Sequence, residues 1–327
     1  ATMALPGSTR LAARAAEAPP DSDLSRTIRL AQREPDPEFA LMLWDDAVDL
    51  EAASGAGSAV ARGGRGLCLL SLGRWGDAEE DLSAAIAAGP GSGSGDERAD
   101  GVLRAVLYDG RGLARLLQDR APEARADFGA ALGAVSLANA FGADVPDIAP
   151  FSGLRGGPPT MGQRAALHAA LAAWKEEGPA RAAQLLDEVD KGPSPDGQPQ
   201  FWEARAALTA ALFASGDGAG AEGEWAALCE KTQQPPPATP TNPVYAQVNK
   251  YAQALVAIEG ATTDMRCEDF ETGDFLPCDD AGLIGTGGSD APCVIFTQDE
   301  ARARLWPAEA VDALAGFRAR APEDSAA

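Results

Sequence analysis

The chain has 327 residues and a formal charge of −22 at pH 7, with 45% hydrophobic but only 6% aromatic residues. A surface this acidic repels phosphate groups, which argues against nucleic acids and anionic membrane surfaces as partners. No apolar run approaches the roughly 18 residues that a membrane-spanning helix needs. Alanine supplies much of the apolar content and strand-forming residues are sparse, which predicts an all-α protein.

Residues 1–22 are predicted to form an N-terminal tail. The sequence opens with ATMALPGSTR, which has neither an initiator methionine nor an apolar targeting core. Such an opening is expected of a mature protein whose targeting peptide has been removed, and a sequence whose true beginning is missing is the alternative. A pair of helices is predicted next, at residues 23–55. In its second helix, Ala40, Trp44 and Ala47 have the same spacing as small and large residues in the helical pairs described below.

Residues 59–92 contain a pattern of small and large side chains that predicts two antiparallel helices. Gly66 and Ala78 are small enough to let the helices approach closely, while Leu82 fills the space between them. Pro90 stops the second helix, because proline removes a backbone hydrogen bond and clashes with the preceding turn.

The pattern recurs, shifted by 46 residues, at residues 105–138, and a third copy covers residues 202–235. In the second copy, Gly112 is the small residue and Phe128 the large residue at the equivalent positions. The Gly/Ser-rich residues 91–104 between the first two copies are expected to be a flexible insertion.

The three copies in register resemble the tetratricopeptide repeat (TPR), a 34-residue helical hairpin. This resemblance implies a right-handed TPR-like α-solenoid over residues 23–235, in which each pair buries its apolar face by stacking on its neighbours. One further pair departs from the family pattern in its first helix and breaks at Gly178 and Pro179. The predicted pairs lie near residues 23–55, 59–92, 105–138, 160–192 and 202–235.

The resemblance also implies a partner-binding groove, lined by the first helix of each pair. The groove positions of the three clear copies hold mostly apolar or acidic side chains and no lysine. They are Val60, Gly63, Leu67, Leu70, Val106, Asp109, Leu113, Leu116, Glu203, Ala206, Ala210 and Phe213. An equal alternative is that these side chains pack against neighbouring helices or against the C-terminal part of the chain.

Three further segments are predicted after the repeats. They are a Pro-rich hinge at residues 236–243, a capping helix at 244–260 and an irregular extension at 261–327. Two short helices are expected in the extension. Thr297 and Glu300 form a capping box that opens the first helix, and the second opens at Pro307 and buries one apolar face. That face consists of Val311, Leu314 and Phe317.

The five cysteines fall into two groups. Cys68 and Cys229 lie within predicted helices, where buried free thiols are expected. Cys267, Cys278 and Cys293 lie in the extension, where a disulfide between two of them would tie down a segment with little core. The favoured pair is Cys267 with Cys278, which encloses the shortest loop; a pair that includes Cys293, or three reduced thiols, are the alternatives. Zinc is disfavoured because no C-x-x-C motif occurs.

No constellation of catalytic residues is evident. His168 is the only histidine, and its place in a helix-forming run predicts a structural role instead of a catalytic base. The Gly-rich GTGGSD lacks the strand and helix that flank a phosphate-binding loop, so a turn is expected. The acidic stretch CEDFETGDFLPCDD does not have the EF-hand ligand spacing and is expected to be a solvated surface. The sequence therefore predicts no enzyme, no cofactor and no metal site.

We expect a non-catalytic scaffold for protein–protein interaction, which docks on a larger protein complex or assists its assembly. The apolar-to-acidic groove predicts that the partner contributes apolar or basic segments. A permanent accessory subunit of such a complex is the alternative, and an enzyme that uses the extension is a remote one.

The Ala-, Gly- and Arg-rich acidic composition resembles that of plastid TPR proteins of algae. This resemblance implies a chloroplast location, with the thylakoid lumen favoured and the stroma as the alternative. The partner would then be a photosynthetic membrane complex, and the chain would be peripheral to the membrane at most.

Overall fold

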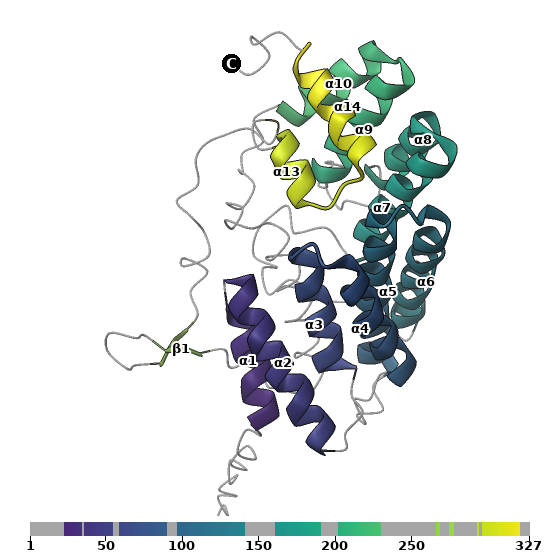
Figure 1. Ribbon diagram of the computed structural model, residues 1–327. Helices are drawn as coiled ribbons and strands as arrows, with labels where there is room; N and C mark the ends of the chain where they lie inside the picture. The colour runs from purple at the N-terminus through teal and green to yellow at the C-terminus, as the bar shows by residue number, and fades with distance from the viewer. Residues whose placement is uncertain are drawn as a thin grey trace, which may run out of the picture.

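The computed structural model describes residues 23–34, 36–54, 59–89, 97–140, 161–190, 202–229, 266–268, 275–277, 293 and 296–320. Within them the chain forms twelve helices and one short strand pair (Figure 1). The helices are α1 (Asp23–Arg33), α2 (Pro37–Ser54), α3 (Val60–Ser71), α4 (Trp75–Ala88), α5 (Glu97–Leu117), α6 (Ala121–Ala140), α7 (Met161–Glu177), α8 (Pro179–Asp190), α9 (Trp202–Ser215), α10 (Gly218–Cys229), α13 (Gln298–Ala303) and α14 (Ala308–Arg318). The strands are β1 (Arg266–Glu268) and β2 (Phe275–Pro277), which pair in antiparallel fashion.

The first ten helices pack in sequence order. Each helix from α1 to α9 contacts the next one along the chain, and α5 also contacts both α3 and α7. The first and last pairs, α1–α2 and α9–α10, therefore lie at opposite ends of the row of helices (Figure 1). The predicted all-α class and the predicted helical pairs are confirmed.

The turns inside three of these pairs have the same backbone geometry. Gly73, Asp119 and Gly216 all have a left-handed φ, of 72°, 62° and 92° respectively. In each turn this residue donates its N–H to the carbonyl three residues before it, and the next residue donates to the carbonyl five residues before itself. Such a Schellman motif ends one helix and reverses the chain at once, which makes the antiparallel hairpin. The break between α7 and α8 falls at Gly178, as predicted.

The helices of a pair approach closely at glycines. A Cβ added to Gly112 would lie 2.5 Å from Cε1 of Phe128, and one added to Gly66 would lie 2.8 Å from Cγ of Leu82. Phe128 and Leu82 are themselves fully buried. The predicted close crossing of small and large residues is therefore present in both pairs.

Helix α5 begins earlier than predicted. It starts at Glu97, so residues 97–104 are helical, although they were expected to belong to a flexible insertion. The added turns bury Leu103, which is 2% exposed and packs in the apolar core. Burial of this side chain offsets the low helix preference of Gly101.

Several predicted segments lie outside the described residues. They are the N-terminal tail at 1–22, the hinge at 236–243 and the predicted capping helix at 244–260. The two short helices of the extension are present as α13 and α14, and Thr297 is the N-cap of α13, because its Oγ1 accepts a hydrogen bond from the N–H of Glu300. The carboxylate of Glu300, the other half of the predicted capping box, accepts a hydrogen bond from Arg304. The stripe of Val311, Leu314 and Phe317 is buried as predicted.

The close approach at Gly112 gives a direct stability test. We expect Gly112→Ala to lower the free energy of unfolding by about 1–2 kcal/mol, because the clash with Phe128 outweighs the better helix propensity of alanine. Gly129 is the matched control on the facing helix, since an added Cβ there meets nothing within 4 Å. Gly129→Ala should raise the free energy of unfolding by about 0.5–1 kcal/mol. Chemical denaturation measures both, and equal effects of the two substitutions would contradict this account of the crossing.

Candidate functional site

The predicted groove side chains are mostly buried. Ten of the twelve are no more than 5% exposed, Gly63 is buried as well, and Phe213 is partly buried. The ten are Val60, Leu67, Leu70, Val106, Asp109, Leu113, Leu116, Glu203, Ala206 and Ala210. They pack inside the chain because helices two places apart, such as α3 and α5, contact each other along this side. The structure thus has the alternative arrangement, in which the groove side chains contact neighbouring helices or the C-terminal part of the chain.

Asp109 and His168 form a buried pair between α5 and α7. Nδ1 of His168 lies 2.8 Å from Oδ1 of Asp109, and both side chains are no more than 1% exposed. The His168 ring also lies 5.5 Å from that of Phe128, measured between centroids. The only histidine is therefore fully buried in a helix–helix contact.

The C-terminal segment, residues 296–320, packs on the face of α9 that was predicted to line the groove. Glu203, which is 3% exposed, accepts a hydrogen bond from Nε1 of Trp306 at 3.1 Å and one from the guanidinium of Arg304 at 3.0 Å. Arg304 also donates to Glu300 within the segment. Two buried charges thus join α9 to the turn that precedes α14.

Aromatic side chains extend this contact along α14. The ring of Phe317 lies edge-on to Phe213 and Trp225, with centroids 5.7 and 5.5 Å away. Two arginines lie over the same rings: Arg318 over Trp225 and Arg320 over Phe213. A second groove residue of α9, Phe213, therefore also contacts the C-terminal segment.

A disulfide joins Cys229, the last residue of α10, to Cys293, which lies three residues before the segment, with their Cα atoms 4.9 Å apart. The prediction of a free thiol at Cys229 is wrong, because the C-terminal segment folds back beside α10. Among the three cysteines of the extension, Cys293 does form a disulfide, but its partner, Cys229, lies outside the extension. Cys267 lies opposite Leu276 in the strand pair, while Cys278 lies outside the described residues, so their disulfide stays a prediction.

Cys68 is buried and free, as predicted. Its thiol donates to the carbonyl of Pro37 at 3.3 Å. Burial, reinforced by the negative charges of Glu38 and Asp45, raises the pKa of the Cys68 thiol to about 12. This cysteine is therefore protonated and unreactive in the folded chain.

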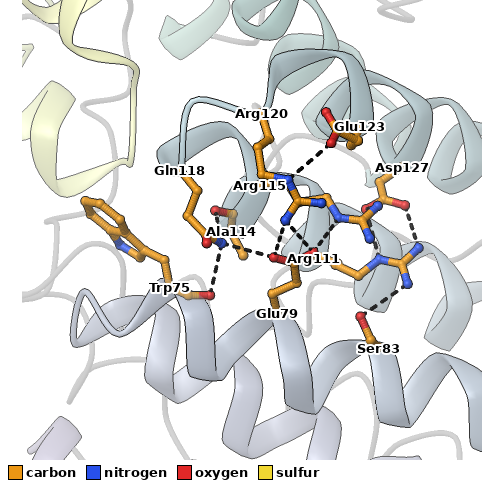
Figure 2. Close-up of polar contacts among 10 residues, drawn as sticks. All are labelled: Trp75, Glu79, Ser83, Arg111, Ala114, Arg115, Gln118, Arg120, Glu123 and Asp127. Atoms are coloured by element: carbon orange, nitrogen blue, oxygen red, sulfur yellow. Dashed lines mark hydrogen bonds and ion pairs between the residues drawn. The ribbon is translucent and has the colours of Figure 1, made fainter.

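A network of ion pairs joins α4, α5 and α6 (Figure 2). The carboxylate of Glu79 accepts hydrogen bonds from Arg115, Arg120 and Gln118 at 2.7–3.2 Å. Asp127, which is 3% exposed, accepts two from Arg111 and one from Arg115. Burial alone would raise the pKa of Glu79, but these hydrogen bonds outweigh it and lower that pKa below its usual value.

The Arg111–Asp127 pair has a copy in the preceding hairpin. Arg65 donates from Nε and Nη2 to both oxygens of Asp81, at 2.6 and 2.7 Å, and the two pairs are related by the same 46-residue shift as the repeats. A planar two-point contact of this kind fixes how one helix sits against the other. The sequence reasoning missed it, although aligned copies of the repeat place an arginine and an aspartate at matching positions.

The large hydrophobic side chains exposed in the described part of the chain gather on the first pair. They are Leu30 on α1 and Phe39 and Met42 on α2, with 52%, 49% and 61% of their surface exposed. Helix α2 contains five acidic residues and no basic one. We call Leu30, Phe39, Met42 and the exposed acidic side chains of α2 the α1–α2 surface.

The remaining features of the described residues concern a metal site, a pocket and a membrane span. No group of three or more His, Cys, Asp or Glu there is arranged to hold a metal ion. A depression of about 430 Å³ lies between α8, α9 and α10, lined by residues that include Asp187, Leu208 and Glu224. No described helix combines the length and apolarity required to cross a bilayer.

Comparison with known proteins gives no relative. No protein-family model, no curated protein and no solved structure matches this chain.

The buried Asp127 should be far more important for stability than an exposed carboxylate in a similar pair. We expect Asp127→Ala to cost about 3–5 kcal/mol of unfolding free energy, because it leaves the partly buried Arg111 without its carboxylate and Arg115 with Glu79 alone. Asp77 pairs with Arg74 where both side chains are more than half exposed, and Asp77→Ala should cost less than about 1 kcal/mol. Denaturation of the two variants measures the difference, and a small loss for Asp127→Ala would show that the network does not hold the hairpins.

Glu203 should make stability depend on pH. Burial would raise the pKa of Glu203, but Arg304, Arg164 and His168 and the hydrogen bond from Trp306 outweigh it, so that pKa is lowered. A lowered folded-state pKa stabilises the protein above the unfolded-state pKa of about 4.3, and this stabilisation disappears as the pH falls through the folded value. We expect Glu203→Gln to destabilise the chain by about 2–4 kcal/mol at pH 7.

The difference in unfolding free energy between wild type and Glu203→Gln should become smaller as the pH is lowered below about 4. Denaturation curves at pH 7, 5, 4 and 3 measure it. A gap that stays constant over this range would contradict a charged Glu203 in the folded chain.

Proposed function

We propose that this chain is a non-catalytic scaffold for protein–protein interaction, built as a TPR-like α-solenoid, and that it docks on or helps to assemble a larger protein complex. The sequential packing of helical pairs with a shared apolar core supports this proposal. Such arrays present extended surfaces to partners because each pair contacts only its neighbours.

The observation that carries the proposal is the α1–α2 surface. Phe39 and Met42 lie one turn apart on α2, so their side chains emerge on the same side of the helix. Exposed apolar side chains that gather on one element mark an interaction site more often than scattered ones do. Methionine in particular adapts to partners of different shape.

The charge of α2 favours a partner with basic side chains. Four of its acidic side chains, Glu38, Asp45, Asp46 and Asp49, are exposed beside the two apolar ones. A partner helix with apolar residues on one face and lysine or arginine at its margins would match both features. We therefore place the apolar-or-basic partner expected from the sequence on this surface. A chloroplast location and a photosynthetic complex as partner remain part of the proposal on the grounds of composition.

Peptide binding tests this function. The probe is a fluorescent 18-residue amphipathic helix of leucine and lysine, whose binding is followed by anisotropy. We expect Phe39→Ser/Met42→Ser to weaken binding at least tenfold, because two apolar side chains no longer enter the interface, each worth about 1.5–3 kcal/mol when fully buried.

The control separates the surface from the overall charge. Ala87 and Ala226 are exposed on α4 and α10, and Ala87→Ser/Ala226→Ser keeps the net charge of the chain, as the test variant does. This control should bind the peptide like wild type. Equal affinity of all three proteins would mean that the peptide binds by charge alone, and the proposed site would be rejected.

A further inference from the structure

The C-terminal segment meets α9 and α10 through contacts that are typical of a protein–protein interface. Glu203 is paired with Arg304 and Trp306, and Phe317 fits between Phe213 and Trp225. Buried tryptophan and arginine anchors, surrounded by smaller contacts, dominate the energetics of most interfaces. An amphipathic helix laid on an apolar face is a common mode of peptide recognition.

The covalent path along the main chain from α10 to this segment is long. Cys229 and Cys293 are 64 residues apart in the sequence, so the main chain between α10 and the segment is long enough to permit separation. The disulfide between these two cysteines is a much shorter link. The guanidinium of Arg318 donates to the carbonyls of Cys293 and Phe296, at 2.8 and 2.9 Å, which ties α14 to the residues beside the disulfide.

We propose that the face of α9 and α10 formed by Glu203, Ala206, Ala210, Phe213 and Trp225 is a binding site for an amphipathic helix, that residues 296–320 are its built-in occupant, and that the Cys229–Cys293 disulfide controls whether this occupant can leave. The ligand class follows from the occupant: a helix that is preceded by an arginine and a tryptophan and has an aromatic residue near its end. The proposal is independent of the α1–α2 surface.

Release requires a dithiol reductant. One thiolate of the reductant attacks a sulfur of the Cys229–Cys293 bond and forms a mixed disulfide, and its second thiol then displaces the protein sulfur. The two protein cysteines take up two electrons and two protons and become thiols, while the reductant becomes a disulfide. No other bond changes. The segment is then held by non-covalent contacts and by the main chain, along which Cys229 and Cys293 are 64 residues apart.

The longer covalent link after reduction determines how much more accessible the binding site becomes. With the disulfide closed, the segment is attached within a few residues of its site, whereas after reduction the covalent path between the two cysteines is 64 residues long, which lowers the effective concentration of the segment. Effective concentration falls with roughly the −3/2 power of loop length, so reduction should make the site about 10- to 100-fold more accessible to a competing helix.

The experiment uses the full chain and a fluorescent peptide of residues 296–320. In the opened variant, Cys293→Ser/Arg304→Ala/Trp306→Ala, the occupant is weakened and the binding face is unchanged. We expect the peptide to bind this variant with a Kd of about 10 µM. Oxidised wild type should bind at least about 100-fold more weakly, and wild type in dithiothreitol should lie between the two. Adding Glu203→Ala to the opened variant should weaken binding at least tenfold, because the peptide then loses the acceptor for its arginine and tryptophan.

Three outcomes would overturn the proposal. The first is an opened variant that does not bind the peptide, and the second is oxidised wild type that binds it equally well. The third is loss of the α1–α10 helices in the opened variant, seen by circular dichroism, because the segment would then be part of the folding core and not an exchangeable ligand. Dimers that form on reduction and exchange their C-terminal segments would support the proposal, since a second copy would then occupy the site.

Discussion

The structure depends on one constraint: a single helical pair cannot bury its apolar side and must pack against the next pair. Small residues make this packing possible, as at Gly63 of α3 and Gly110 of α5, where an added Cβ would lie 2.7 Å from Cδ2 of Leu107 and of Leu67 in the neighbouring pair. Glycines play the same part inside the pairs, at Gly66 and Gly112. An array of this kind gains stability through each shared interface, and it also leaves an end at which apolar side chains stay exposed.

Paired charged residues fix the relative position of the helices, which packing of small side chains alone would leave less well defined. The two-point pairs Arg65–Asp81 and Arg111–Asp127 each join the two helices of one hairpin, and Glu79 links one hairpin to the next through Arg115 and Arg120. Because guanidinium and carboxylate are planar, these contacts restrict how far the helices can slide or rotate. At the other end of the chain, Glu203 uses the same chemistry to hold the C-terminal segment. Packing thus supplies the stability, and paired charges define the geometry.

The features that could be predicted from sequence are local ones. The helical pairs, the turn at Gly178, the buried thiol of Cys68 and the N-cap at Thr297 all follow from residues close together in the chain. The start of α5 at Glu97 was not predictable from its Gly/Ser-rich neighbourhood, because a tertiary contact of Leu103 decides it. The pairing of Cys229 with Cys293 and the occupied face of α9 were missed for the same reason, since both depend on where a segment some 64 residues away folds back. Groove positions taken from a repeat register cannot say whether the chain itself fills them.

The central claim is that the C-terminal segment closes over α9 and α10, so that the chain covers part of its own predicted groove. Peptide mapping by mass spectrometry, under non-reducing conditions and after alkylation of free thiols, tests this most directly. The account predicts a cross-linked peptide pair that contains Cys229 and Cys293, together with Cys68 alkylated only after unfolding. A linkage of Cys293 to Cys267 or Cys278, with Cys229 recovered as a free thiol, would contradict it.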